Sequence, residues 1–87
     1  MSDASDGTWR DDVRIALQQL GGQAPLDAIY RTVRQIRTAE NRTIPPSAEA
    51  IVRRTLEENC SETDSYRGLQ NIFTMPAGKG AGLWALR

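Results

Sequence analysis

The sequence predicts a mainly α fold in which three amphipathic helices are followed by a small β-hairpin. Two observations predict it. Apolar residues recur at helical three-and-four spacing in three separate stretches, and two short runs of strand-forming residues further along flank a glycine-rich segment. The chain has 87 residues, which is enough for one hydrophobic core. We therefore expect one domain over residues 9–87, preceded by a flexible polar arm over residues 1–8.

The first predicted helix runs from Trp9 to Leu20. Two acidic residues in its first turn, Asp11 and Asp12, suit the positive end of the helix dipole. The Gly21-Gly22 pair is expected to end the helix, because glycine adopts the left-handed conformation found at helix ends. The apolar stripe consists of Trp9, Val13, Ala16, Leu17 and Leu20.

The second predicted helix begins at Pro25, since proline is tolerated at a first helical position, and continues to about Ala39. A polar connection over residues 40–43 follows it. The apolar side of this helix carries Leu26, Ile29, Tyr30, Val33 and either Ile36 or Arg37, and its outer side carries Arg31, Arg34, Gln35 and Thr38.

The third predicted helix covers residues 47–59. The prolines Pro45 and Pro46 predict an extended approach, and Ser47 is expected to cap the helix through its side chain. Helical spacing divides the following residues into two sides. Ala48, Ile51, Val52, Thr55 and Leu56 point inward, while Glu49, Arg53, Arg54, Glu57 and Glu58 point outward.

The remaining residues predict a loop and a hairpin. Residues 60–70 are polar, and Tyr66 and Leu69 are expected to fold back onto the core. Residues 71–75 and 82–87 predict two strands joined by a glycine-rich turn. Alternation along the strands places one apolar face of the hairpin against the helices, made of Phe73, Met75, Trp84 and Leu86.

The charges are balanced overall but unevenly distributed. Eleven basic and eleven acidic residues give a net charge of zero, which argues against non-specific coating of nucleic acid. The arginines gather between Asp27 and Thr55, so the middle of the chain is basic. Ten of the eleven basic residues are Arg, a bias that favours bidentate recognition of base edges or phosphates.

Catalytic and metal-binding classes have little support. The chain has no His and one Cys, too few ligands for a usual zinc site, and we expect Cys60 to be buried as a small hydrophobe. The segment Gly78–Gly82 lacks the flanking residues of a phosphate-binding P-loop. We expect no catalytic activity, metal, cofactor or small-molecule substrate.

The sequence contains no apolar run long enough to span a membrane, and residues 1–8 carry no secretion signal. We therefore expect a cytoplasmic protein without a membrane partner.

Three helices followed by a hairpin is the element order of winged helix-turn-helix domains. An ordered set of short motifs accompanies it, and the run Gly82-Leu-Trp-Ala-Leu-Arg87 is the most specific of them. The others are Leu20-Gly21-Gly22, Leu26-x-x-Ile29-Tyr30, Ile51-Val-Arg-Arg-Thr-Leu-Glu57, Tyr66-x-Gly68, Phe73 and Gly78-Lys79-Gly80. Over almost all of residues 9–87, the chain resembles the winged helix-turn-helix DNA-binding domains associated with bacterial restriction-type endonucleases.

The resemblance implies that the protein binds double-stranded DNA. The helix over residues 47–59 would be the recognition helix in the major groove, and residues 71–87 would be the wing on the backbone or in the minor groove. The protein would be a targeting module of a restriction-type system, with modified DNA among its ligands, or a small transcriptional regulator. A nuclease domain or another effector protein would be its partner.

The candidate DNA-binding residues lie on the third helix, in the hairpin turn, and on or after the second helix. Arg53 and Arg54 are candidates for base and phosphate contacts, and Lys79 for a phosphate contact. Either arginine could instead pair with Glu49 or Glu57 at helical spacing, and the second-helix arginines could form a solvated face. The full set is Ser47, Glu49, Ala50, Arg53, Arg54, Glu57, Lys79, Arg31, Arg34 and Arg42.

A protein-interaction module is the alternative hypothesis. It is motivated by the net charge of zero and by Glu49, Glu57 and Glu58 on the proposed recognition helix. If acidic residues neutralise Arg53 and Arg54, and the second-helix arginines lie on the opposite side of the domain, protein binding becomes the better hypothesis.

Overall fold

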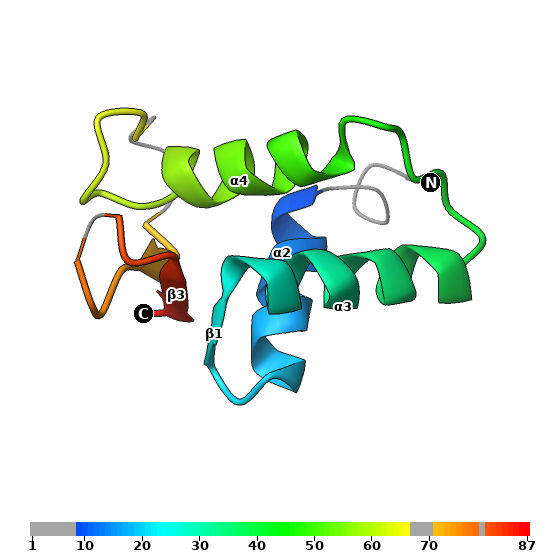
Figure 1. Ribbon diagram of the computed structural model, residues 1–87, viewed down its shortest axis with the longest axis horizontal. Helices are drawn as coiled ribbons and strands as arrows, with labels where there is room; N and C mark the ends of the chain where they lie inside the picture. The colour runs from blue at the N-terminus through cyan, green and yellow to red at the C-terminus, as the bar shows by residue number, and fades with distance from the viewer. Residues whose placement is uncertain (1–8, 67–70, 79) are drawn as a thin grey trace.

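A computed structural model describes residues 9–66, 71–78 and 80–87, and these residues form three helices and one three-stranded sheet (Figure 1). The predicted mainly α, winged-helix-like fold is confirmed. The predicted arm over residues 1–8, as well as Leu69 and Lys79, lies outside the described residues. The elements are α2 (Trp9–Gln19), β1 (Gln23–Pro25), α3 (Leu26–Ala39), α4 (Ala48–Glu58), β2 (Phe73–Thr74) and β3 (Leu83–Leu86).

The helix α2 is the central element of the fold. It packs against α3, α4 and β3, and Figure 1 shows it starting just below α4 and running behind α3. Its predicted stripe is the buried side, and Val13, Ala16 and Leu17 have no exposed surface. Burial of an aliphatic side chain as large as Val or Leu stabilises a fold by about 1.5–3 kcal/mol. The rest of the core comes from the facing elements: Ala24, Ile29, Val33, Val52, Leu56, Cys60, Phe73 and Trp84.

Two of the helices end in the same hydrogen-bonded motif. At the end of α2, Gly21 has a φ of 90°, and the N–H of Gly22 donates to the carbonyl of Leu17 at 2.8 Å. This is the Schellman motif that a glycine pair favours. At the end of α3, Asn41 takes the left-handed position with a φ of 57°, which asparagine tolerates better than most residues. The N–H of Arg42 then donates to the carbonyl of residue 37 at 2.8 Å, so the chain reverses at Arg42.

The predicted hairpin is part of a three-stranded antiparallel sheet with the strand order β1-β3-β2. The pairing of β2 with β3 was predicted, and Phe73 lies opposite Leu86. The strand β1 was not predicted; its Ala24 lies opposite Trp84. Pro25 has an extended backbone (φ −74°, ψ 161°) and precedes α3 rather than forming its first residue. A three-residue strand is too short to show alternation, and proline is tolerated because β1 is an edge strand.

A buried ion-pair network joins α2 to the connection between α3 and α4. The side chain of Asp12 is buried and accepts hydrogen bonds from Arg37 (Nη1 to Oδ2, 2.6 Å) and from Arg42. The Nε of Arg37 also donates to the carbonyl of Thr43 at 2.7 Å. The guanidinium of Arg37 lies over the ring of Trp9, 3.9 Å from its centroid. One carboxylate therefore holds two helices and a loop together.

Replacement of Asp12 by Ala should lower the free energy of unfolding by about 3 kcal/mol, because Arg37 and Arg42 lose their shared acceptor in the interior. Urea denaturation of Asp12→Ala and the wild type measures this difference. The matched control is Asp11→Ala, because the neighbouring Asp11 is partly exposed and 3.8 Å from Arg14; it should lose less than about 1 kcal/mol. Equal losses in the two variants would contradict the role given to Asp12.

Candidate nucleic-acid interface

The outer side of α4 carries most of the residues that the sequence predicted to be exposed. Glu49, Ala50, Arg53 and Arg54 are exposed, whereas Glu57 and Glu58 are half-buried. The predicted inward side is buried at Ala48, Val52, Thr55 and Leu56. Figure 1 shows α4 along the upper edge of the molecule, with α2 and α3 below it. One side of α4 therefore packs on the core, and the other faces solvent.

The two adjacent arginines of α4 have no ion-pair partner among the described residues. Glu49 lies four residues before Arg53, a spacing that favours pairing within a helix. It pairs instead with Arg34 of α3, and its Oε2 lies 3.2 Å from Nη2 of that arginine. The guanidinium groups of Arg53 and Arg54 therefore remain available to a ligand.

Ser47 occupies the N-cap position of α4, but the expected side-chain cap is wrong, because its hydroxyl makes no capping hydrogen bond. The backbone of Ser47 has φ −89° and ψ 14°, outside the extended region typical of capping residues. The backbone makes the first turn instead. The N–H of Ala48 donates to the carbonyl of Pro45, and the N–H of Ile51 donates to the carbonyl of Ser47, each at 3.0 Å.

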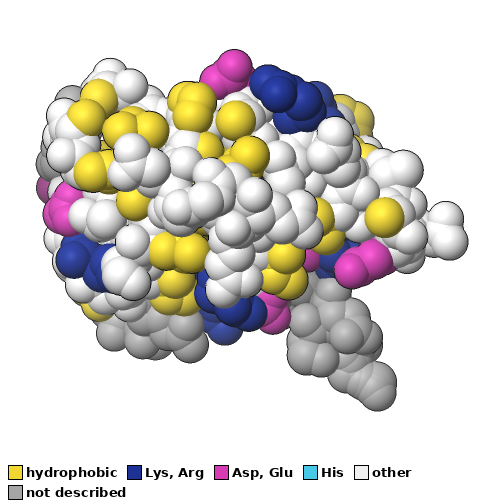
Figure 2. Space-filling model, turned by 90° about the horizontal axis from the view of Figure 1, so that it is seen from below, with side chains coloured by type: hydrophobic (Ala, Val, Ile, Leu, Met, Phe, Trp, Pro, Cys, Tyr) yellow, Lys and Arg dark blue, Asp and Glu magenta, His cyan; other side chains and the backbone are white. Residues whose placement is uncertain are grey.

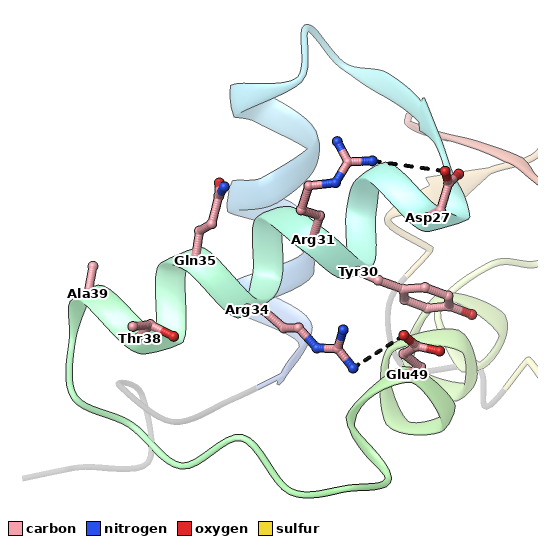
Figure 3. Close-up of a pocket in the computed structure, with 8 residues that line it drawn as sticks. All are labelled: Asp27, Tyr30, Arg31, Arg34, Gln35, Thr38, Ala39 and Glu49. Atoms are coloured by element: carbon pink, nitrogen blue, oxygen red, sulfur yellow. Dashed lines mark ion pairs between the residues drawn. The ribbon is translucent and has the colours of Figure 1, made fainter.

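The two exposed arginines of α3 both form ion pairs at the surface (Figure 3). Arg31 pairs with Asp27 of the same helix at 3.9 Å, and Arg34 pairs with Glu49 across the two helices. These residues line an open groove of about 610 Å³ along the outside of α3. Exposed pairs of this kind are worth about 0–1 kcal/mol, so a phosphate can replace the carboxylate partner with little loss of stability.

Arg42 is the candidate that the structure removes from the accessible surface. Its side chain is 16% exposed, and its guanidinium binds Asp12 and, at 2.8 Å, Glu40. The hydrogen bond to Asp12 raises the pKa of Arg42 above the usual arginine value. Because the guanidinium holds the α3–α4 connection in place, Arg42 is less accessible to a phosphate than the exposed arginines of α4.

A second groove, of about 430 Å³, lies between α4 and the strands of the wing. Arg53 and Glu57 line its helix side, Asp64 its loop side, and Leu83 and Trp84 its strand side. The described lining residues therefore include two acidic side chains and one basic side chain, next to the apolar residues of the strand. This groove is less suited to a phosphate backbone than the outer side of α4.

The wing is attached to the C-terminal end of α4 through its backbone. The carbonyl of Asn59 accepts the N–H groups of Ile72 at 2.9 Å and Phe73 at 3.2 Å. The hydroxyl of Thr63 donates to the carbonyl of Glu57 at 2.5 Å, which satisfies one of the free carbonyls at the helix end. The last turn of α4, the following loop and β2 therefore hold one another in place.

A carboxylate strengthens the same attachment. Glu62 accepts hydrogen bonds from the hydroxyl of Thr74 and, at 3.1 Å, from the N–H of Met75. The guanidinium of Arg87 lies 2.9 Å from the same carboxylate. The hydrogen bond from Thr74, followed by that from Met75, lowers the pKa of Glu62 below the usual glutamate value.

Figure 2 views the molecule from below, so that this face is directed away from α4. Small groups of basic side chains lie near the edge of this face, most of them beside an acidic side chain, and hydrophobic and other side chains occupy its centre. Among the described residues on this face, the basic side chains form no continuous positive surface. The outer side of α4 is therefore the better candidate for contact with an anionic ligand.

Two groups of residues that hold the site in place were not identified from the sequence. The sequence did contain an indication of the Asp12–Arg37 pair. Both residues fall on the apolar sides of their helices, where a buried charge needs a partner of opposite charge. The sequence contained no indication of the Glu62–Arg87 pair. These residues are 25 positions apart, and they lie in a polar loop and beside a strand end.

The sequence matches no protein-family model and no curated protein, and no solved structure matches the chain. Within the described ranges, no helix is both long enough and apolar enough to cross a membrane. The same residues include no group of three or more His, Cys, Asp or Glu side chains that could hold a metal ion. A function is therefore inferred from the geometry of the side chains.

The stabilisation from Glu62 should disappear in acid. Its pKa is lower in the folded than in the unfolded protein, so its contribution is present above about pH 4.3, the usual glutamate pKa, and is lost as the pH falls through the folded-state pKa. The difference in melting temperature between the wild type and Glu62→Gln should therefore be largest near pH 7 and shrink below pH 4.3. Thr74→Val, which removes the main donor, should show a weaker pH dependence than the wild type. A difference independent of pH would contradict this account.

Proposed function

We propose that this protein binds double-stranded DNA, with α4 as the recognition helix in the major groove and residues 71–87 as the wing on the backbone or in the minor groove. The observation that carries the proposal is the pair of exposed guanidinium groups of Arg53 and Arg54, which have no partner within the described part of the chain. An α-helix with its side chains is about 10–12 Å in diameter, which suits a major groove about 12 Å wide.

The two arginines suit different contacts with a duplex. Consecutive residues of a helix project about 100° apart, so Arg53 and Arg54 reach different parts of the groove. Arginine donates two parallel hydrogen bonds either to O6 and N7 of guanine or to a phosphate. The exposed Ala50 lies one turn before Arg54 and is small, so the helix can approach the base pairs closely.

The charge balance supports a targeting module rather than a strong independent binder. A net charge of zero provides little long-range attraction to DNA, so the affinity of the domain alone is modest. We favour a role in a restriction-type system, in which a nuclease domain or another effector protein supplies the chemistry. A small transcriptional regulator is the second form of this proposal, and DNA with modified bases is among the proposed ligands.

One observation favours a protein-interaction module instead. In the groove between α4 and the wing, Glu57 and Asp64 lie near Arg53 over an apolar floor, and mixed surfaces of this kind are typical of protein contacts. The neutralisation expected of such a module is not seen at Arg53 among the described residues, because Glu49 pairs with Arg34.

The variants Arg53→Ala and Arg54→Ala should each weaken duplex binding by roughly 1–3 kcal/mol without unfolding the domain, because each removes a charged donor at the surface. Gel-shift titrations at fixed salt measure the affinity, and thermal melts check the fold. Arg14→Ala is the matched control, since Arg14 is a 40% exposed arginine that lies on α2 rather than on α4. If both α4 variants bind as tightly as Arg14→Ala, α4 is not the recognition helix.

Lys79 lies outside the described residues and remains a sequence-based candidate for a phosphate contact in the wing. The variant Lys79→Ala should weaken binding to all duplexes alike and reduce the slope of log K against log salt by about 0.9, the value for one lost phosphate contact. Titrations over a salt series with two unrelated duplexes measure both effects. A changed sequence preference would instead indicate that the wing contacts bases.

A further inference from the structure

The ion pair between Arg34 and Glu49 crosses from α3 to the first turn of α4 at the edge of the proposed interface. The two side chains are 48% and 52% exposed and lie 3.2 Å apart. Figure 3 shows the pair bridging the two helices, while the pair of Arg31 and Asp27 lies within α3. The carboxylate of Glu49 is therefore oriented by a residue of α3 and not by a residue of its own helix.

One oxygen of this carboxylate remains available to a ligand. The ion pair uses Oε2, and the described residues make no other hydrogen bond with Glu49. A carboxylate accepts hydrogen bonds at about four lone-pair positions. Glu49 is thus an exposed acceptor that already has a cation beside it, which reduces its repulsion from DNA phosphates.

The position of Glu49 on α4 suits contact with bases. In helix-turn-helix proteins, the first residues of the recognition helix contact the base edges. In the major groove, the hydrogen-bond donors are the exocyclic amines of cytosine and adenine, whereas guanine and thymine present acceptors there. A carboxylate at this position therefore accepts a hydrogen bond from the first two bases and is repelled by the other two.

We infer that Glu49, positioned by Arg34, is a specificity-determining residue that recognises the exocyclic amine of a cytosine or adenine in the major groove. The inference rests on the proposed function, because it assumes that α4 enters that groove. It assigns separate roles within the interface. Arg53 and Arg54 supply most of the affinity, and the Arg34–Glu49 pair adds discrimination at one further base.

Selection from randomised duplexes tests the inference, with the affinity for one unselected duplex measured in parallel. The wild type should enrich cytosine or adenine over guanine and thymine at one position by on the order of tenfold, and the selected base identifies which amine is recognised. Glu49→Ala should lose this enrichment and bind the unselected duplex as tightly as the wild type or more tightly, because a negative charge has been removed.

The variants of Arg34 separate positioning from a direct phosphate contact. Arg34→Ala should reduce the enrichment and bind all duplexes about threefold more weakly, because the carboxylate is no longer held and neutralised. The double variant Arg34→Ala/Glu49→Ala should recover the affinity of Glu49→Ala. If the double variant stays as weak as Arg34→Ala, Arg34 contacts phosphate directly and the positioning role is overturned.

The chain offers a matched control in the other exposed pair of the groove. Asp27→Ala removes the same charge about two turns before Arg34 on α3, and it should leave the selected sequence unchanged. If the wild type binds duplexes but Glu49→Ala selects the same sequence, the inference fails and the proposed function stands. If the wild type binds no duplex at low salt, both fail.

Discussion

The fold depends on the buried carboxylate of Asp12, which binds the guanidinium groups of Arg37 and Arg42. These contacts connect the central helix α2 with α3 and with the loop that leads to α4. A buried ion pair is not always more stable than a hydrophobic contact, but loss of one partner leaves an uncompensated charge in the interior. Arrangements in which α3 and its following loop shift relative to α2 are therefore strongly disfavoured. This constraint fixes the direction in which the chain enters α4.

The arginines in the middle of the chain have the same charge but different roles. Arg37 and Arg42 are structural, since they lie in the network with Asp12. Arg31 and Arg34 are exposed but paired with carboxylates. Arg53 and Arg54 are the exposed pair on α4. Among the described residues of this basic stretch, the exposed guanidinium groups without an ion-pair partner therefore lie on one helix. For the proposed function, this distribution favours selective binding over general attraction to polyanions.

The helices, the hairpin and the inward side of α4 could be predicted from the sequence because each follows from local periodicity. The strand β1 could not, since three residues show no period and their partner strand lies about sixty positions later in the chain. The predicted side-chain cap at Ser47 does not form. The two preceding prolines lead into a backbone turn, and a carbonyl of this turn accepts a hydrogen bond from the first residue of the helix. The structural role of Arg42 could not be predicted either. The left-handed turn at Asn41 brings its side chain to Asp12, and no rule based on sequence spacing predicts this contact.

The attachment of β2 to the end of α4 has a mechanical consequence. The carbonyl of Asn59 and the carboxylate of Glu62 bind the start and the end of β2, so these contacts hold β2 at a set distance from the end of α4. A double helix held by both elements would have to bend or twist to match this separation. Flexible base-pair steps would then be accommodated more readily than stiff ones, so the domain would discriminate between duplexes even at positions it does not touch.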